Sequence, residues 1–355
     1  MVNKYLVISP NGYGNVGDDI CAYSGKYAIE QVDPNAEVKI SQPPMKLSLV
    51  EWADYIILSG GGILYDRAAK NLENYMQYID KAHELGKKSA VLGVGVQGIV
   101  TDDGKKRYVE SLNKCEFVSV RTEKDRQLLE DIGFNKAVAT FDIAFFTPAM
   151  LESFTPKLNW LRKRKQQKLL KDNKPRIGIC MINLKMLKGD SYDGIYRQFD
   201  EGVAKFIGDY SNKFDIYLLQ HAKEDGGLMR EVARSGATFV PYNDINDLPN
   251  LFGIFNNLDM MMGVRLHSIA LGLMSDTPTI GVGSTTAKQK RLANYALPTL
   301  DKQFYSFNDV DGLLKLLKNI GESGKINLSR LNKAEQAKIQ ELNQQNLTLL
   351  KKMIS

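Results

Sequence analysis

Residues 5–19 read YLVISPNGYGNVGDD, an apolar run that leads through a loop with three glycines into a helical pattern. A buried parallel strand, a glycine-rich turn and a helix N-terminus produce this order of residues. The same alternation recurs through the first half of the chain and predicts a parallel sheet with helices on both faces. The strands expected in this half are residues 5–9, 55–59, 89–94, 117–120 and 137–140. The helices expected between them are residues 19–32, 71–85, 105–113 and 123–132.

The alternation breaks near Thr147 and resumes at residue 176. Strands are expected at residues 176–182, 214–220, 238–241, 258–262 and 279–282, and helices at 197–210, 226–235, 248–256 and 268–274. The chain is therefore predicted to contain two α/β domains. They span residues 1–150 and 176–325, with a basic linker at residues 151–175 and an amphipathic helix at residues 326–355.

Length and composition agree with this organisation. A chain of 355 residues suits about two domains at roughly 150 residues each. Hydrophobic residues make up 43% and charged residues 25%, which excludes a disordered or collagen-like chain. The three cysteines are far apart and form no CxxC pair, which disfavours a zinc ribbon or a dithiol site. With no signal peptide and no apolar run of about 18 residues, a cytoplasmic protein is expected.

The positive charge of the chain is concentrated in one segment. Residues 157–176 hold nine Lys or Arg against one Asp, a local charge of +8, so the rest carries −2 of the total +6. Because the chain outside this segment is slightly acidic, nucleic-acid binding over the whole protein surface is not expected. Trp160 and Leu161 stand within the basic segment. Two interpretations remain open: a solvated linker helix, or a patch that rests on an anionic membrane surface.

Glycine-rich loops follow three strands of the first half, and the third of them is at residues 92–98. Gly12, Gly14 and Gly17 match G-x-G-x-x-G, a weak sign of a dinucleotide site, and the alternative is a tight turn with Asp18 capping the next helix. Asn15 within this loop is a candidate ligand contact. A second loop holds Gly60, Gly61 and Gly62, which indicate close backbone approach, to a ligand or to another loop.

Single polar residues at other strand ends are further candidates. Arg121 ends one strand and is either an anion contact or the partner of Asp142, an acid in an apolar segment that needs one. His221 follows a strand of the second half, as a substrate contact or as a supporting residue. Lys288 follows a later strand and either reaches the same edge of the sheet or is a solvated loop lysine.

Residues 258–268, LDMMMGVRLHS, run from a strand into a helix and carry the sharpest signal. If the backbone is extended there, Arg265 and His267 point to the same side, and Ser268 caps the helix. One place would then hold a permanent cation, a group that titrates near neutral pH and a helix N-terminus. This combination is suited to a phosphate beside a general acid or base.

These segments, in this order, resemble the polysaccharide pyruvyl transferase family. The matching pieces are GNVGD at 14–18, SGGG at 59–62, GVG at 93–95, VR at 120–121, DIAF at 142–145, GVRLH at 263–267 and TPTIG at 277–281, followed by Lys288. The chain departs from the family at Thr122, where an acid is common, and at residues 95–98, where glycine and proline often stand close together.

The resemblance implies two Rossmann-like domains that face a cleft, as in the GT-B architecture. It implies transfer of pyruvate from phosphoenolpyruvate to two hydroxyls of a sugar, which forms a cyclic ketal and releases phosphate. Phosphoenolpyruvate is then a donor substrate, and neither a cofactor nor a metal is expected. His267 suits the proton transfers and Arg265 suits phosphate or carboxylate binding.

Further roles follow from the same resemblance. Arg121 and Lys288 are weaker anion ligands, and Asn15 and Asp18 are candidates for binding acceptor hydroxyls. The glycines at 60–62, His221 and Ser268 complete the expected substrate-binding set. Two other functions stay open: a nucleotide-sugar glycosyltransferase of the same architecture, and a non-catalytic protein that binds a glycan or a partner. The sequence specifies neither the acceptor sugar nor the oligomeric state.

Overall fold

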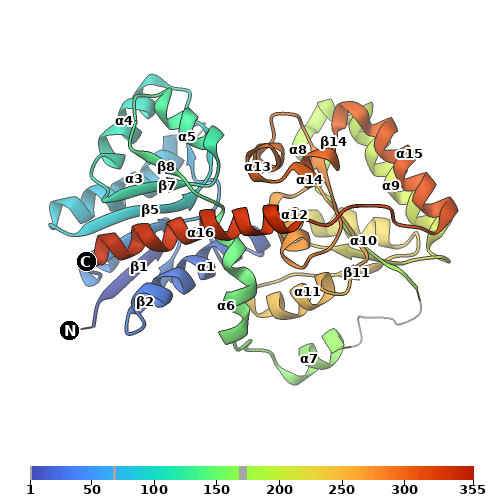
Figure 1. The fold of residues 1–355 in the computed structure, drawn as a ribbon, viewed down its shortest axis with the longest axis horizontal. Coiled ribbons are helices and arrows are strands. Elements are labelled where there is room, and N and C mark those ends of the chain that lie inside the picture. Colours follow the sequence, from blue (N-terminus) through green and yellow to red (C-terminus); the bar gives the residue numbers. More distant parts are fainter. Residues whose placement is uncertain (1, 67–68, 168–173) are drawn as a thin grey trace. The chain divides into compact units, whose positions relative to one another are not determined.

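The computed structural model describes residues 2–66, 69–167 and 174–355, and within them the chain forms two compact units (Figure 1). Unit 1 comprises Met1–Gly12, Gly17–Glu152 and Gln336–Ser355. Unit 2 comprises Tyr13–Val16 and Ser153–Glu335. The C-terminal segment thus belongs to unit 1, and a short piece of the first loop belongs to unit 2.

Unit 1 is built on a six-stranded parallel sheet with the order β2-β1-β3-β5-β7-β8. Its strands are β1 (Lys4–Ile8), β2 (Glu37–Ser41), β3 (Tyr55–Ser59), β5 (Lys88–Val94), β7 (Phe117–Val120) and β8 (Ala137–Ala139), and β4 (Leu64–Tyr65) pairs separately with β6 (Val96–Gly98). Its helices are α1 (Val16–Val32, which begins at the last residue of the unit 2 piece), α2 (Ser48–Trp52), α3 (Ala69–Glu84), α4 (Asp102–Leu112), α5 (Glu123–Glu130) and α6 (Thr147–Ser153, which ends at the first residue of unit 2). The central strands are almost wholly buried, as continuous apolar runs predict.

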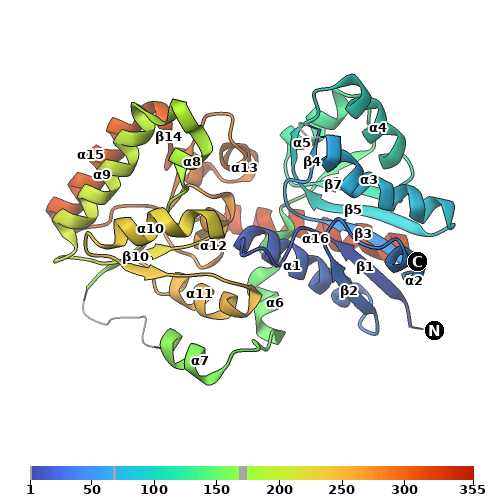
Figure 2. The ribbon, with the colours of Figure 1, turned by 180° about the vertical axis from the view of Figure 1, so that it is seen from behind.

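Unit 2 repeats this plan with the order β11-β10-β9-β12-β13-β14, the strand order of the Rossmann fold. Its strands are β9 (Arg176–Cys180), β10 (Asp215–Leu219), β11 (Thr238–Val240), β12 (Met260–Gly263), β13 (Thr279–Gly283) and β14 (Phe304–Ser306). Its helices are α7 (Trp160–Gln167), α8 (Leu184–Lys188), α9 (Ile195–Tyr210), α10 (Gly226–Ala233), α11 (Leu248–Phe255), α12 (Leu266–Met274), α13 (Lys288–Ala296), α14 (Pro298–Lys302) and α15 (Val310–Ser323). Helices α9 and α15 lie side by side on one face (Figures 1 and 2).

The topology selects one place in each unit for a ligand. In unit 1 the strand order reverses between β1 and β3, and in unit 2 between β9 and β12. At such a point the two flanking loops diverge and leave a crevice beyond the carboxyl ends of the strands, where open α/β sheets bind their ligands. The loops at these points include Gly60–Gly62 in unit 1 and Arg265 in unit 2.

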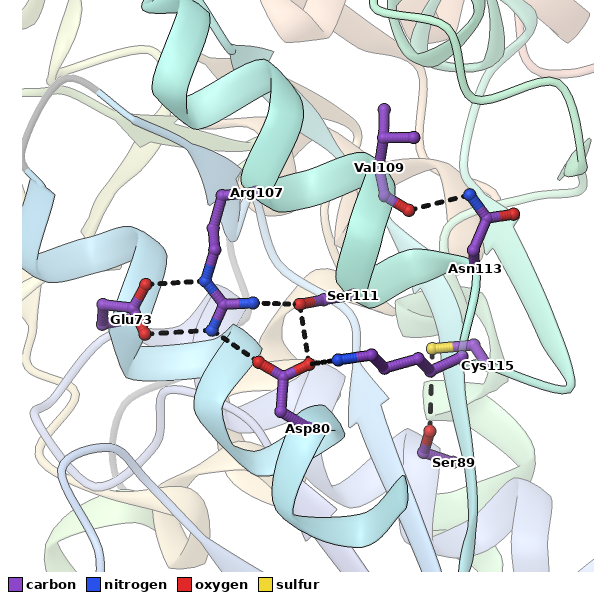
Figure 3. Close-up of polar contacts among 9 residues, drawn as sticks. Glu73, Asp80, Ser89, Arg107, Val109, Ser111, Asn113 and Cys115 are labelled. Atoms are coloured by element: carbon purple, nitrogen blue, oxygen red, sulfur yellow. Dashed lines mark hydrogen bonds and ion pairs between the residues drawn. The ribbon is translucent and has the colours of Figure 1, made fainter. Parts of the chain in front are cut away.

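A charged network joins α3 to α4 and the turn after it in unit 1 (Figure 3). Arg107 donates to both carboxylate oxygens of Glu73, at 2.8 and 3.1 Å, and its Nη2 lies 2.6 Å from Oδ2 of Asp80. Lys114 donates to Oδ1 of Asp80 at 2.7 Å. Burial acts to raise the pKa of Asp80, but the hydrogen bonds from Lys114, Arg107 and Ser111 outweigh it and lower the pKa.

The last helix, α16 (Lys333–Ile354), packs on unit 1 from Gln336 onward. It begins later than the helix expected from residue 326, and its buried apolar residues include Leu342 and Leu350. Asn346 lies on the same helix and is fully buried although it is polar. Its Oδ1 accepts from the hydroxyls of Ser119 at 2.8 Å and Thr140 at 2.9 Å, and its Nδ2 donates to the carbonyl of Phe141 at 3.2 Å. The amide therefore ties α16 to the carboxyl ends of β7 and β8.

Asn346→Ala is expected to lower the free energy of unfolding by about 2–3 kcal/mol, because three buried hydrogen bonds within unit 1 are lost together. Urea unfolding followed by circular dichroism measures the effect. Gln344→Ala, at an exposed position of the same helix, is the matched control and should change stability by less than about 0.5 kcal/mol. Equal midpoints for both variants would contradict the assignment.

Candidate active site at the carboxyl edge of the second sheet

The strongest candidate site lies in unit 2, where β12 leads into α12. Arg265 is the last extended residue, with φ −83° and ψ 137°, and occupies the position before the first helical residue, Leu266. The expectation of an extended backbone through residue 267 is wrong, because Leu266 and His267 are already helical. Ser268 is not the cap either: it lies in the first turn, and its hydroxyl donates to the carbonyl of Arg265 at 2.6 Å.

Two carboxylates hold the guanidinium of Arg265. Its Nε donates to Oδ2 of Asp225 at 2.7 Å and its Nη2 to Oε1 of Glu224 at 2.8 Å. Asp225 is fully buried, and its Oδ1 accepts from the backbone N–H of Asn183 at 2.8 Å. Burial acts to lower the pKa of Arg265, but these carboxylates outweigh it and raise the pKa. Within the described residues Nη1 makes no hydrogen bond, so a permanent cation in fixed orientation retains donors for an anion.

The partners of Arg265 were not among the residues selected from the sequence. Asp225 stands directly before Gly226 and Gly227, in the position that precedes helix α10. An acid followed by two glycines shortly after a predicted strand is the signal that could have identified it. The ion pair itself joins residues 40 positions apart, and nothing local in the sequence indicates that distance.

His221 lies beyond the end of β10 and is only 1% exposed. Neither ring nitrogen has a hydrogen-bond partner within the described residues, and the ring meets Phe255 edge-on with centroids 5.9 Å apart. Burial, together with electrostatic interactions with Arg265 and His267, lowers the pKa of His221 to about 3. The ring is therefore neutral at pH 7. Of the two roles left open for it, the buried position favours a supporting group beside Arg265.

Acid is expected to destabilise the protein through His221. Its pKa is lower in the folded than in the unfolded chain, so the unfolded state binds more protons below about pH 6.5 and the folded state loses stability as the pH falls. His221→Phe removes the titrating group, so the stability of the variant should not show this loss. The difference in unfolding free energy, variant minus wild type, should therefore be about 2 kcal/mol larger at pH 5 than at pH 7.5. Urea unfolding at the two pH values tests this. A difference that does not change with pH would refute it.

Other predicted residues gather around the same edge of unit 2. Asn15 pairs with Ala222 in an antiparallel bridge, and the N–H of Val16 donates to the carbonyl of His221 at 2.8 Å. Lys288 is half-buried and begins α13, after the strand next to β12. The side chain of the following residue, Gln289, donates to the carbonyl of Val264, immediately before Arg265. His267, in the first turn of α12, is 9% exposed.

In unit 1 the glycines at 60–62 pack against neighbouring side chains. Gly60 has φ +54°, and a Cβ there would lie 2.4 Å from Cβ of Cys21. A Cβ on Gly62 would lie 1.7 Å from the amide nitrogen of Gln97, and one on Gly61 would lie 3.9 Å from Oδ1 of Asp18. Close approach of Gly60 and Gly62 is thus observed, but to side chains of α1 and β6 and not to another loop. The other predicted explanation, approach to a ligand, stays a prediction.

The expected capping by Asp18 is wrong, because α1 begins at Val16 and Asp18 already lies within the helix. Asp19 is 2% exposed, and its Oδ1 accepts from the backbone N–H of Gly12 at 2.6 Å, which closes the first glycine loop. Asp18 lies in the first turn of α1 and is half-buried. Its proposed contact with an acceptor hydroxyl stays a prediction.

Arg121 is 2% exposed and forms the ion pair that was one of its two predicted roles. Its Nη1 donates to Oδ2 of Asp142 at 3.2 Å, and its Nε lies 3.8 Å from Oδ2 of Asp125. Asp142 therefore has the partner expected for it. The structure supports a buried ion pair for Arg121, whereas an anion contact stays a prediction.

Comparisons with known proteins agree with this picture. The pattern of the family described as polysaccharide pyruvyl transferase matches residues 15–286. In sequence, the chain matches none of the curated proteins with which it was compared. Among the described residues, no helix is both long enough and apolar enough to cross a membrane.

Solved structures show the fold. The UDP-GlcNAc 2-epimerase of Neisseria meningitidis superposes with a TM-score of 0.62 at 11% identity, over 99% of this chain and 100% of that one. The epimerase of Methanocaldococcus jannaschii gives 0.58 at 12% identity, covering 97% and 100%. A glycosyltransferase of Rickettsia africae gives 0.56 at 14% identity, covering 100% and 99%. These likenesses confirm the predicted α/β architecture of two Rossmann-like units of the GT-B kind.

Proposed function

Because the chain belongs to the polysaccharide pyruvyl transferase family, we propose that it transfers pyruvate from phosphoenolpyruvate to two hydroxyls of one sugar. The sugar is part of a polysaccharide or its precursor, and the products are a cyclic ketal and phosphate. The observation that carries the proposal is the guanidinium of Arg265, held by Asp225 at the N-terminus of α12 with donors still available. We also propose that the protein acts in the cytoplasm, as the sequence predicts.

The reaction needs an anion receptor and a proton carrier. A proton adds to the methylene carbon of phosphoenolpyruvate while one sugar hydroxyl bonds to C2 and loses its proton. A second hydroxyl then bonds to C2, the bond from C2 to the phosphate oxygen breaks, and the second proton leaves with phosphate or a base. The atoms and electrons of these steps balance without an oxidant, a reductant or a metal.

The residues of unit 2 divide these tasks. Arg265 binds the phosphate or carboxylate of the donor through its remaining N–H groups, and the N-terminus of α12 adds favourable electrostatics. His267, in the first turn of that helix, carries protons to and from the reacting groups. Lys288 is a second cation for the same anion. The buried, neutral ring of His221 adds no positive charge that would compete for the donor.

The direct test is release of inorganic phosphate from phosphoenolpyruvate in the presence of a panel of acceptor sugars. Mass spectrometry of the sugar should show the added pyruvyl ketal. Phosphate release that does not depend on any acceptor, or an unmodified sugar after release, would contradict the proposal.

A nucleotide-sugar glycosyltransferase is the second candidate, supported by the fold it shares with the Rickettsia africae glycosyltransferase. Thermal shift separates the two donors. Stabilisation by phosphoenolpyruvate and not by a panel of nucleotide sugars favours pyruvyl transfer. The reverse result favours glycosyl transfer, and ligand binding without any turnover favours a non-catalytic glycan-binding protein.

A further inference from the structure

The basic segment contains a helix that is docked on unit 2. Asn159 precedes α7, and its side chain accepts from the backbone N–H of Arg162 at 2.9 Å. Arg162 turns toward the body of the unit, where its Nε donates to Asp247 at 2.7 Å and its Nη1 to Asp244 at 3.2 Å. The N–H of Lys157 donates to the side chain of Asn246 at 2.7 Å. These contacts hold the helix against the loop before α11, so this part of the segment is not a free linker.

The faces of α7 are inverted relative to an ordinary surface helix. A surface helix buries its apolar side chains and exposes its charges. Here the charged Arg162 faces the protein, whereas Trp160 is 66% exposed and Leu161 is 60% exposed. Lys163 and Arg164 are exposed beside them. The helix thus presents an indole, a leucine and two cations to the outside at one place.

This composition suits the surface of an anionic membrane. Indole rings favour the boundary between water and lipid, and short apolar insertions combine with basic residues to bind anionic lipid. The charge is local, since the chain outside residues 157–176 carries a net −2, so the attraction would act through this segment and not through the whole body. Lysines at 165, 168 and 171 continue the basic sequence.

We propose that α7 is a membrane-docking surface, in which Trp160 and Leu161 enter the lipid interface and Lys163 and Arg164 contact anionic headgroups. The ion pairs of Arg162 keep the helix on unit 2, so that membrane binding positions the unit that carries Arg265. The proposal is independent of the chemistry assigned to that unit, because it concerns where the protein sits and not what it transfers.

Vesicle sedimentation tests the proposal with the full chain. Vesicles of phosphatidylcholine alone are compared with vesicles that contain one third phosphatidylglycerol. Wild type should sediment with the anionic vesicles only, and added salt should weaken the binding. Trp160→Ser with Leu161→Ser, and separately Lys163→Glu with Arg164→Glu, should each weaken it by about tenfold or more. Melting curves show whether the variants fold.

The matched control is a second exposed apolar pair in unit 2. Met186 and Leu187 on α8 are 71% and 63% exposed and stand between Lys185 and Lys188. Figures 1 and 2 show α7 and α8 at opposite ends of the unit. Met186→Ser with Leu187→Ser should leave vesicle binding unchanged.

Several results would overturn the proposal. Wild type left in the supernatant, or bound equally to both kinds of vesicle, excludes an anionic membrane surface. Loss of binding in the α8 variant, with the α7 variants unaffected, places the surface elsewhere. A single-stranded oligonucleotide that binds in place of the vesicles, through the same α7 residues, would assign the surface to nucleic acid. Because no turnover is measured, none of these results depends on the proposed reaction.

Discussion

His267→Ala is expected to lower phosphate release from phosphoenolpyruvate by about 10²–10⁴-fold, the usual contribution of a positioned general acid or base. His267 lies in the first turn of α12, two residues after Arg265, at the carboxyl edge of the second sheet. If it carries the proton, the loss should fall on turnover more than on the affinity for phosphoenolpyruvate. Initial rates over a range of donor concentrations separate these two quantities.

His83→Ala is the control for this prediction. The chain has only three histidines, and His83 is exposed on α3 of unit 1. Its removal should leave the rate unchanged, and both variants should melt close to wild type. An alanine at 267 that keeps wild-type turnover would remove this residue from the reaction.

Asp225→Ala is expected to lower the free energy of unfolding by about 3–5 kcal/mol, the range for removing one partner of a buried ion pair. Asp225 is fully buried, and its loss leaves both Nε of Arg265 and the N–H of Asn183 without an acceptor. Urea unfolding measures the change. Asp225→Asn keeps an acceptor oxygen and provides a milder variant if the alanine does not fold.

Glu224→Ala is the matched control, since it removes the other carboxylate of the same arginine. Its side chain is 46% exposed, and exposed ion pairs contribute no more than about 1 kcal/mol. We therefore expect the two alanine variants to differ by at least about 2 kcal/mol. If they lose equal stability, Asp225 does not hold the arginine in the manner described.

The central strands of both sheets could be predicted from the sequence, whereas only two of the four edge strands, β8 and β11, were predicted. The expected strand at residues 55–59 agrees with β3, and that at 117–120 agrees with β7, because both are continuous apolar runs in the middle of a sheet. β2 and β14 were missed. Neither β2 nor β14 contains a fully buried residue, so neither has the continuous apolar pattern of a buried parallel strand.

The place of the Arg265–His267 segment in the fold could be predicted from the sequence, but its backbone geometry could not. The segment with Arg265 and His267 lies at the carboxyl edge of a parallel sheet, as the strand-to-helix transition predicts. Whether the chain is extended or helical at residue 267 depends on where α12 begins. The first residue of a helix is among the features that are hardest to predict from a sequence. Asp225, which holds Arg265, was not selected because it is one acid among many in the sequence.

The sequence by itself determined the central strands and the helices between them, their grouping into two α/β halves and the short list of polar residues at strand ends. Periodicity and glycine placement are local, and local patterns decide local structure. Only the tertiary structure decided which distant residues meet: Arg265 with Asp225, Asn346 with Ser119, and Arg162 with Asp247. Each of these contacts satisfies a buried or partly buried polar group through a residue at least 40 positions away, and no local pattern encodes such a partner.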